Sequence, residues 1–149
     1  MTNPASNFGN QWTIAQGTWH NGLPIIMRLR TEIDDHVGSP DYAIGYRITW
    51  KFANPTKDGY PSESDRDLMD AFELKLIKEF ESSSTAIVVA VVTHNGERDF
   101  ICYTGDPNSA HTLFNKTFAA DPARPLSFAA AADPEWQEYI GMRAQVADD

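Results

Sequence analysis

The chain has 149 residues and a formal net charge of −9, from 12 basic and 21 acidic side chains. This length is typical of one domain, and a composition of 42% hydrophobic and 22% charged residues excludes a disordered or fibrous protein. The acidity favours cationic partners and disfavours non-specific binding to nucleic acid. Cys102 is the only cysteine, so neither an intramolecular disulfide nor a thiolate metal cage can form.

The N-terminal segment predicts the compartment. Residues 1–9 are polar and lack the basic start and apolar run of a signal peptide, and we expect them to be flexible. The longest apolar run, 86–92, is too short to span a bilayer. These features predict a cytoplasmic protein that does not bind a membrane.

The segment that follows predicts a β-hairpin. Two strands, 11–19 and 23–30, are joined by His20-Asn21-Gly22, and Asn-Gly favours a tight type I′ turn because both residues tolerate a positive φ. Pro24 indicates an edge position or a bulge. Alternation in the second strand places Leu23, Ile25, Met27 and Leu29 on one face, and Arg28 and Arg30 on the other.

The third predicted strand has the clearest pattern of the chain. Between Tyr42 and Phe52, large apolar residues alternate with small or polar ones, which is typical of a strand with one buried and one exposed face. The buried side would hold Tyr42, Ile44, Tyr46, Ile48, Trp50 and Phe52, and the other side Ala43, Gly45, Arg47, Thr49 and Lys51. We therefore expect one face of the sheet to stay open to a partner.

The rest of the chain predicts three helices and three strands. A helix over 62–80 begins at Ser62, a good N-cap residue, and carries an apolar stripe. The apolar run 87–92 predicts a central strand, and Asn95-Gly96 turns the chain back into a strand over 98–104. The last elements are a helix from Asp106-Pro107 to about 118, a strand containing Leu126 and Phe128, and a short helix that opens at Asp133-Pro134-Glu135.

The predicted order is β-β-β-α-β-β-α-β with a C-terminal helical turn, which is an α+β pattern. From the third strand onward it is the split βαββαβ order of ferredoxin-like folds. We therefore predict a ferredoxin-like two-layer sandwich, preceded by an N-terminal β-hairpin and followed by a short C-terminal helix. The hairpin would either extend the sheet or fold over one edge. The expected organisation is a flexible N-terminus over 1–9, one α+β domain over 10–142 and an acidic C-terminal tail over 143–149.

No motif for catalysis or cofactor binding accompanies this architecture. None of the four histidines lies in a helical metal-ligand motif with another His, Cys or carboxylate: His20, His36, His94 and His111. Nucleophile elbows, phosphate loops and dinucleotide fingerprints are also missing. The sequence therefore predicts no catalytic residue, no metal ligand and no cofactor. A metal or catalytic site could arise only where folding brings distant side chains together.

Charged and aromatic residues indicate surfaces for a partner. Carboxylates of the first helix could attract a basic protein, chelate a cation or simply face solvent; they are Glu63, Asp67, Asp70 and Glu73. Basic residues occupy the non-core positions of two strands, where pairing with acids is a commoner use than RNA binding, which would need exposed aromatics; they are Arg28, Arg30, Arg47 and Lys51. Trp136 and Tyr139 lie three residues apart, so they form either a contact surface or the face by which the last helix docks on the sheet.

Several short motifs occur in a fixed order along the chain: Trp12, Pro24 with Arg28 and Arg30, Asp58-Gly59-Tyr60-Pro61, Thr93-His94-Asn95-Gly96-Glu97-Arg98-Asp99-Phe100 leading to Tyr103, and Asp133-Pro134-Glu135-Trp136. In this order they resemble the family known as domain of unknown function 695 over residues 12–140. The resemblance implies a bacterial protein that occurs alone or joined to a domain similar to the regulator of ribonuclease E activity B. It implies regulation by binding a basic enzyme, and it implies no catalytic residues.

Together these features favour a non-catalytic module that binds a basic protein and inhibits or regulates it. An immunity-type inhibitor of a bacterial toxin or nuclease would be such a module. Two alternatives stay open. One is a small hydrolase whose histidine and carboxylates are brought together by folding, with His94 or His111 in a deep pocket beside an acid. The other is a ligand- or RNA-sensing module on the basic face of the sheet.

Overall fold

The computed structural model describes residues 8–18, 22–53 and 55–147 of the chain. Six strands and three α-helices follow in the predicted order, with two short 3₁₀ turns before the third strand. The elements are β1 (Gln11–Thr18), β2 (Pro24–Thr31), η1 (Asp34–His36), η2 (Pro40–Tyr42), β3 (Ile44–Lys51), α1 (Glu63–Ser82), β4 (Ala86–His94), β5 (Glu97–Thr104), α2 (Pro107–Thr117), β6 (Leu126–Ala132) and α3 (Gln137–Ala147).

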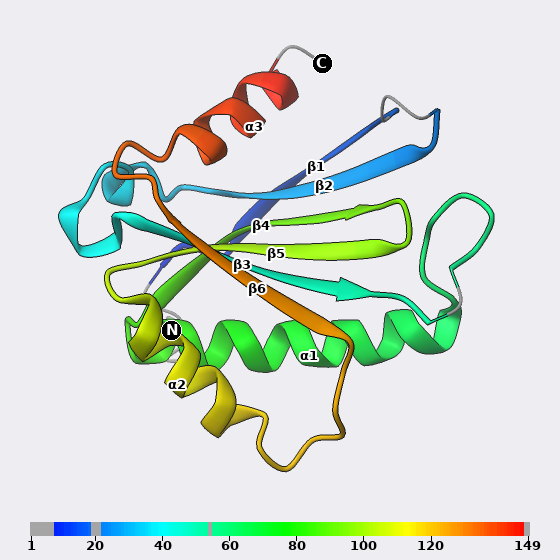
Figure 1. Cartoon of the computed structure of the whole chain (residues 1–149). Coiled ribbons are helices and arrows are strands. Elements are labelled where there is room, and N and C mark those ends of the chain that lie inside the picture. The colour runs from blue at the N-terminus through cyan, green and yellow to red at the C-terminus, as the bar shows by residue number, and fades with distance from the viewer. Residues whose placement is uncertain (1–7, 19–21, 54, 148–149) are drawn as a thin grey trace.

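The strands form one antiparallel sheet in the order β1-β2-β4-β5-β3-β6 (Figure 1). The α+β class is therefore confirmed. Strand β2 pairs with β4, so the N-terminal hairpin extends the sheet instead of folding over an edge. The sheet consequently has two strands more than the four of a βαββαβ pattern, and β1 and β6 are its edge strands.

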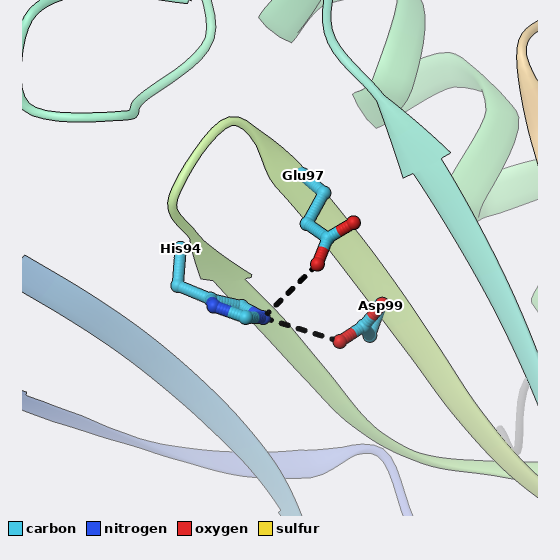
Figure 2. Close-up of side chains that lie close together, drawn as sticks. All are labelled: His94, Glu97 and Asp99. Carbon is cyan, nitrogen blue, oxygen red and sulfur yellow. Dashed lines mark hydrogen bonds and ion pairs between the residues drawn. The ribbon is translucent and has the colours of Figure 1, made fainter. Parts of the chain in front are cut away.

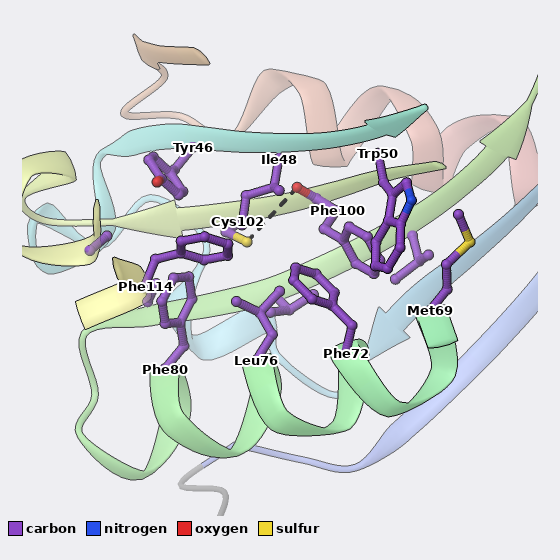
Figure 3. Close-up of a cluster of buried hydrophobic side chains, with 14 of the residues drawn as sticks. Tyr46, Ile48, Trp50, Met69, Phe72, Leu76, Phe80, Phe100, Cys102 and Phe114 are labelled. Atoms are coloured by element: carbon purple, nitrogen blue, oxygen red, sulfur yellow. Dashed lines mark hydrogen bonds between the residues drawn. The ribbon is translucent and has the colours of Figure 1, made fainter. Parts of the chain in front are cut away.

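One face of the sheet packs against α1 and α2 (Figure 3). Alternation in β3 directs Tyr46, Ile48 and Trp50 into this core, where they meet α1 side chains such as Phe72 and Phe80. The prediction of a buried apolar side is thus confirmed for these three residues, whereas Ile44, at the start of the strand, is only half-buried. Tyr42 differs further: it lies in η2 before the strand begins, and it packs in the cluster on the opposite face.

The opposite face is partly covered, which corrects the expectation that it stays open. Helix α3 lies across it, and Trp136 and Tyr139 are fully buried there. The Trp136 ring stacks on Tyr103 with 4.2 Å between ring centroids, its Nε1 donates to the Tyr42 carbonyl at 2.8 Å, and the Tyr139 hydroxyl donates to the Arg30 carbonyl at 2.6 Å. Of the two uses weighed for this aromatic pair, the structure shows docking on the sheet.

The helix boundaries follow local capping chemistry. Ser62 accepts a hydrogen bond from the Asp65 amide and caps α1, as predicted. The last helix differs from its prediction, because Trp136 adopts a positive φ of 58° and α3 begins only at Gln137. It then continues to Ala147, through most of the segment expected to be an acidic tail.

The structure describes only some of the residues on which the N-terminal predictions were made. Phe8 was expected in a flexible segment, but it is buried and makes edge contacts with His36 and Tyr42. The expected flexibility of residues 1–7 and the His20-Asn21 turn lie outside the described residues. Gly22, which follows that turn, has the positive φ of 85° expected of such a glycine.

Candidate functional site

Helix α3 leaves part of its sheet face uncovered, and a groove of about 450 Å³ remains beside it. We call this the α3 groove. Its apolar side chains come from the middle of the sheet, among them Met27, Val92 and Ile101. Glu138, Met142 and Gln145 of α3 form one wall, and His94, Glu97 and Asp99 bring the titratable groups. The combination of an apolar floor and convergent polar groups is typical of a binding site.

The β4–β5 hairpin places these three titratable residues on one face. His94 is directly opposite Glu97 across the two strands, and Asp99 lies two residues after Glu97. Because side chains two residues apart in a strand share a face, all three project toward the α3 groove. The turn between the strands is Asn95-Gly96, and both residues have positive φ values, of 45° and 84°, as the sequence predicted.

The turn of this hairpin is fixed by the loop before α1. The Gly96 amide donates to the Gly59 carbonyl at 2.8 Å, and the Gly96 carbonyl accepts from the Phe52 amide at 2.8 Å. Gly59 has a φ of 83°, and a Cβ atom at this position would lie 2.9 Å from the backbone of Asn95. A glycine is therefore required for this close approach, which holds the hairpin and its side chains in place.

The three side chains converge on one nitrogen atom (Figure 2). His94 Nε2 lies 3.3 Å from Asp99 Oδ2 and 3.9 Å from Glu97 Oε1. The hydroxyl of Thr49, on β3, donates to the other Asp99 oxygen, Oδ1, at 2.7 Å and so orients the carboxylate. An imidazole with two carboxylates can hold a divalent cation or act as an acid–base pair.

A second hollow of about 470 Å³ lies over β6 on the same face of the sheet, and we call it the β6 hollow. Gly45 of β3 and Ala129 and Ala131 of β6 line it, and their small side chains leave the space empty. It shares Arg47 and Glu138 with the α3 groove, and these two residues form an ion pair. The two hollows are thus neighbours along α3.

The outer edge of β6 is open to solvent. Six of its seven residues are exposed, Ser127 to Ala132, and the strand carries neither a charge nor a proline. The amide of Asp133 donates to Ala43, and the Lys51 amide donates to Pro125. Since hydrogen-bonded pairs alternate along an antiparallel ladder, odd-numbered residues of β6 bond to β3. The backbone N–H and C=O groups of Phe128, Ala130 and Ala132 therefore point away from the sheet.

Several residues predicted to bind a partner have structural roles instead. Arg30 is fully buried and forms a two-point ion pair with Glu81 at 2.8 and 2.9 Å. Glu73 is buried and pairs with Arg28. Arg30 and Glu73 are therefore buried, like Trp136 and Tyr139, whereas the Arg28 side chain keeps part of its surface exposed.

The predicted basic face is divided between the two sides of the sheet. Arg28 and Arg30 project toward α1, whereas Arg47 and Lys51 project into the α3 groove. The cause is the strand order, because β4 and β5 separate β2 from β3 and the alternation of one strand does not fix the faces of the other. Glu63, Asp67 and Asp70 are exposed on α1, and their role in binding stays a prediction.

The hydrolase alternative named His94 or His111 beside an acid, and the structure places His94 beside Asp99 and Glu97, two acids that sequence reasoning did not identify. The signal of this cluster was a histidine followed by acids at the third and fifth positions, with an intervening Asn-Gly turn that indicates a hairpin. His111 has a different setting: its Nδ1 lies 2.8 Å from the Tyr46 hydroxyl, whose pKa is raised by burial. Burial likewise raises the pKa of the Cys102 thiol.

Comparison with known proteins places the chain in a family. The sequence model of the family described as "Family of unknown function (DUF695)" matches residues 10–142. No curated protein and no solved structure matches the chain. Among the described residues, no helix combines the length and the apolar character needed to cross a membrane. Because the match covers most of the sequence, the chain belongs to the DUF695 family of unknown function.

Proposed function

We propose that this chain is a non-catalytic protein-binding module that inhibits or regulates a basic partner protein, and that an extended segment of the partner pairs with the open edge of β6. Toxins and nucleases are partners of suitable charge, because proteins that act on nucleic acid are commonly basic. Immunity-type inhibition in the cytoplasm would fit a chain with a net charge of −9.

The observation that carries this proposal is the exposed edge of β6. Natural proteins commonly protect an edge strand with charges, prolines or bulges, and β6 has no charge and no proline. The outward N–H and C=O groups of Phe128, Ala130 and Ala132 form a ready template for strand addition. The small side chains along this edge allow another backbone to approach closely.

The surroundings of β6 would select the added segment. Asp133 and Glu135 follow the strand and give its C-terminal end acidic character, which favours basic residues of a partner. The β6 hollow could receive a side chain of the added strand on one face of the sheet. On the other face, Phe128 contacts the ring of His111 with 4.8 Å between centroids and offers an apolar surface.

The edge strand β1 resembles β6 in having no charged residue, but its surroundings differ. On the α1 face, Trp12 lies under the guanidinium groups of Arg28 and Arg30, with the Arg30 carbon 4.8 Å from its ring centroid. Residues of β1 line neither the α3 groove nor the β6 hollow. The edge of β6 is therefore the better candidate for pairing with a partner.

A pair of variants at one position tests the proposal. Ala130→Pro removes an N–H that points away from β3, so the sheet keeps its own hydrogen bonds while an added strand loses a donor and meets the proline ring. Ala130→Val keeps the N–H and has high β propensity. Basic proteins encoded beside the gene would be purified and titrated against the wild type and both variants by calorimetry.

We expect the wild type and Ala130→Val to bind one of these proteins, and Ala130→Pro to bind it at least tenfold more weakly. Circular dichroism should show the same fold for all three proteins. Equal affinity of Ala130→Pro and Ala130→Val would exclude pairing at β6, and failure of the wild type to bind any candidate would count against a protein partner.

The α3 groove favours a second candidate, the small hydrolase, because His94, Glu97 and Asp99 are brought together there by folding. A panel of ester, phosphoester and peptide substrates would test it. Activity that is lost in His94→Ala would support the hydrolase over the binding module, whereas an inactive wild type would remove it.

The strand order also supports an inference about fold kinship. We infer that the segment from β3 to β6 is a ferredoxin-like unit to which the N-terminal hairpin has been added. The support is the sheet order β4-β5-β3-β6, in which β3 and β5 are central and the helices α1 and α2 cover one face.

A further inference from the structure

We propose that His94, Glu97 and Asp99 bind a divalent transition-metal ion, with Zn²⁺ the best match to their chemistry. The site lies in the α3 groove and depends on the β4–β5 hairpin, so it is independent of pairing at the β6 edge. It would hold whether the protein serves as a binding module or as an enzyme.

The number of groups that converge on His94 Nε2 points to a metal. A protonated Nε2 carries one hydrogen and can donate one good hydrogen bond, yet two carboxylates approach it. The Nε2–Oδ2 distance to Asp99 is 3.3 Å, which is long for a charged hydrogen bond, and the Nε2–Oε1 distance to Glu97 is 3.9 Å. A metal ion satisfies all three groups at once, because each supplies a lone pair.

The separations also agree with the size of a coordination sphere. Metal–ligand bonds of about 2.0–2.2 Å in a tetrahedral site separate the ligand atoms by roughly 3.3–3.6 Å. The His94–Asp99 separation of 3.3 Å lies in this range, and the three ligand atoms lie within 4.8 Å of one another. Only Glu97 has to move closer, and its side chain is the most exposed of the three, at 27%.

The supporting contacts are those expected around a metal ligand. Thr49 holds Asp99 through Oδ1, which leaves Oδ2 to face His94. The hydrogen bonds of Gly96 to Gly59 and Phe52 fix the turn between His94 and Glu97. The three protein ligands leave a fourth position for water or an incoming ligand, which is the arrangement of an open zinc site in a groove.

The choice of metal follows from the donor types. An imidazole with two carboxylates is a borderline donor set that suits Zn²⁺ and its transition-metal neighbours, whereas Ca²⁺ and Mg²⁺ prefer oxygen ligands alone. Two carboxylates and a neutral imidazole carry two negative charges, which balance the ion. Arg47 and Lys51 also line the groove, and their positive charges would weaken cation binding while favouring an anionic ligand at the open position.

Calorimetric titration of the full chain with Zn²⁺ tests the proposal, after treatment with a chelator and its removal. We expect one ion per chain, with binding weakened at least tenfold in His94→Gln and in Asp99→Asn. His111→Gln is the matched control, because it removes a histidine outside the site, and its affinity should equal that of the wild type. Replacing Zn²⁺ with Co²⁺ gives a second readout, since ligation by His94 should produce a visible absorption band that His94→Gln lacks.

Thermal unfolding with and without Zn²⁺ separates loss of the site from loss of the fold. The wild type and His111→Gln should melt at a higher temperature when Zn²⁺ is added. His94→Gln should still melt cooperatively, and its melting temperature should be the same with and without Zn²⁺. Absence of binding heat in the wild type would overturn the proposal. Binding that persists undiminished in His94→Gln or Asp99→Asn would also overturn it, because the ion would then sit elsewhere.

Discussion

The guanidinium of Arg30 and the carboxylate of Glu81 meet inside the protein, where both side chains have no solvent exposure. Glu81 also accepts a hydrogen bond from the Val88 amide at 3.0 Å, and Arg30 donates to the Val88 carbonyl at 3.2 Å. This ion pair therefore connects β2, β4 and the last turn of α1. The ion pair explains how β2 is held to helix α1.

Removing one partner of this pair should destabilise the fold strongly. Glu81→Leu leaves the Arg30 charge buried without its partner, and we expect a loss of about 3–5 kcal/mol in the free energy of unfolding. The double variant Arg30→Met with Glu81→Leu removes both charges and should recover most of that loss. Urea unfolding measures both values, and a double variant less stable than Glu81→Leu would contradict the assignment.

The contact between Gly59 and Asn95 predicts an unequal effect of two alanine substitutions. Gly38 and Gly59 both have a φ near 80°, of 81° and 83°, but nothing lies within 4 Å of a Cβ atom at Gly38. Gly38→Ala should cost only backbone strain, about 1–2 kcal/mol. Gly59→Ala adds a clash with Asn95 and should cost clearly more, because the loop or the hairpin has to move.

Unfolding of the two alanine variants in urea gives the comparison. A larger loss for Gly59→Ala confirms that the loop and the hairpin turn are in contact. Similar losses for both variants would show that the loop before α1 does not hold the hairpin.

Acid should loosen the attachment of α3 through Asp133. Partial burial alone would raise the pKa of Asp133, but hydrogen bonds from the Tyr103 hydroxyl and from the amides of Gln137 and Glu138 outweigh it and lower the pKa. A lowered pKa contributes stability above the unfolded value, about 3.9 for Asp, and this contribution is lost as the pH falls through the folded value.

Asp133→Asn should consequently be less stable than the wild type at neutral pH, and the difference should shrink as the pH falls below about 4. Glu135→Gln, which changes an exposed neighbouring carboxylate, serves as the control and should show little difference at either pH. Urea unfolding at several pH values gives both curves. A difference between Asp133→Asn and wild type that stays constant with pH would rule out the hydrogen-bonded carboxylate as its source.

Local sequence signals predicted the order of the elements because these signals act over a few residues. The N-cap at Ser62, the Asn95-Gly96 turn and the alternation of β3 each depend on near neighbours, and each is present in the structure. Helix α3 was misplaced because the cap-and-proline rule was applied to Asp133-Pro134. The side chain of Asp133 does accept amide hydrogen bonds, but from Gln137 and Glu138, after an extra turn that Trp136 closes with a positive φ.

The candidate site depended on long-range placement, which local signals do not contain. An alternation with period two assigns residues to the two faces of a single strand. It does not predict that Arg30 on β2 and Arg47 on β3 lie on opposite faces of the sheet, because β4 and β5 lie between these strands. Arg30 also looks like a surface residue until its partner, 51 residues away, is known. The convergence of His94 with Asp99 was within reach, because both belong to one hairpin with a recognisable turn.

Hydrogen–deuterium exchange of the complex with a bound partner tests the central claim most directly, because it reads the backbone of β6 itself. We predict that the amides of Phe128, Ala130 and Ala132 exchange more slowly in the complex than in the free protein, since each would donate to the added strand. The amides of β1 should exchange at the same rate in both. Unchanged exchange over 126–132 in a fully bound sample would contradict the account.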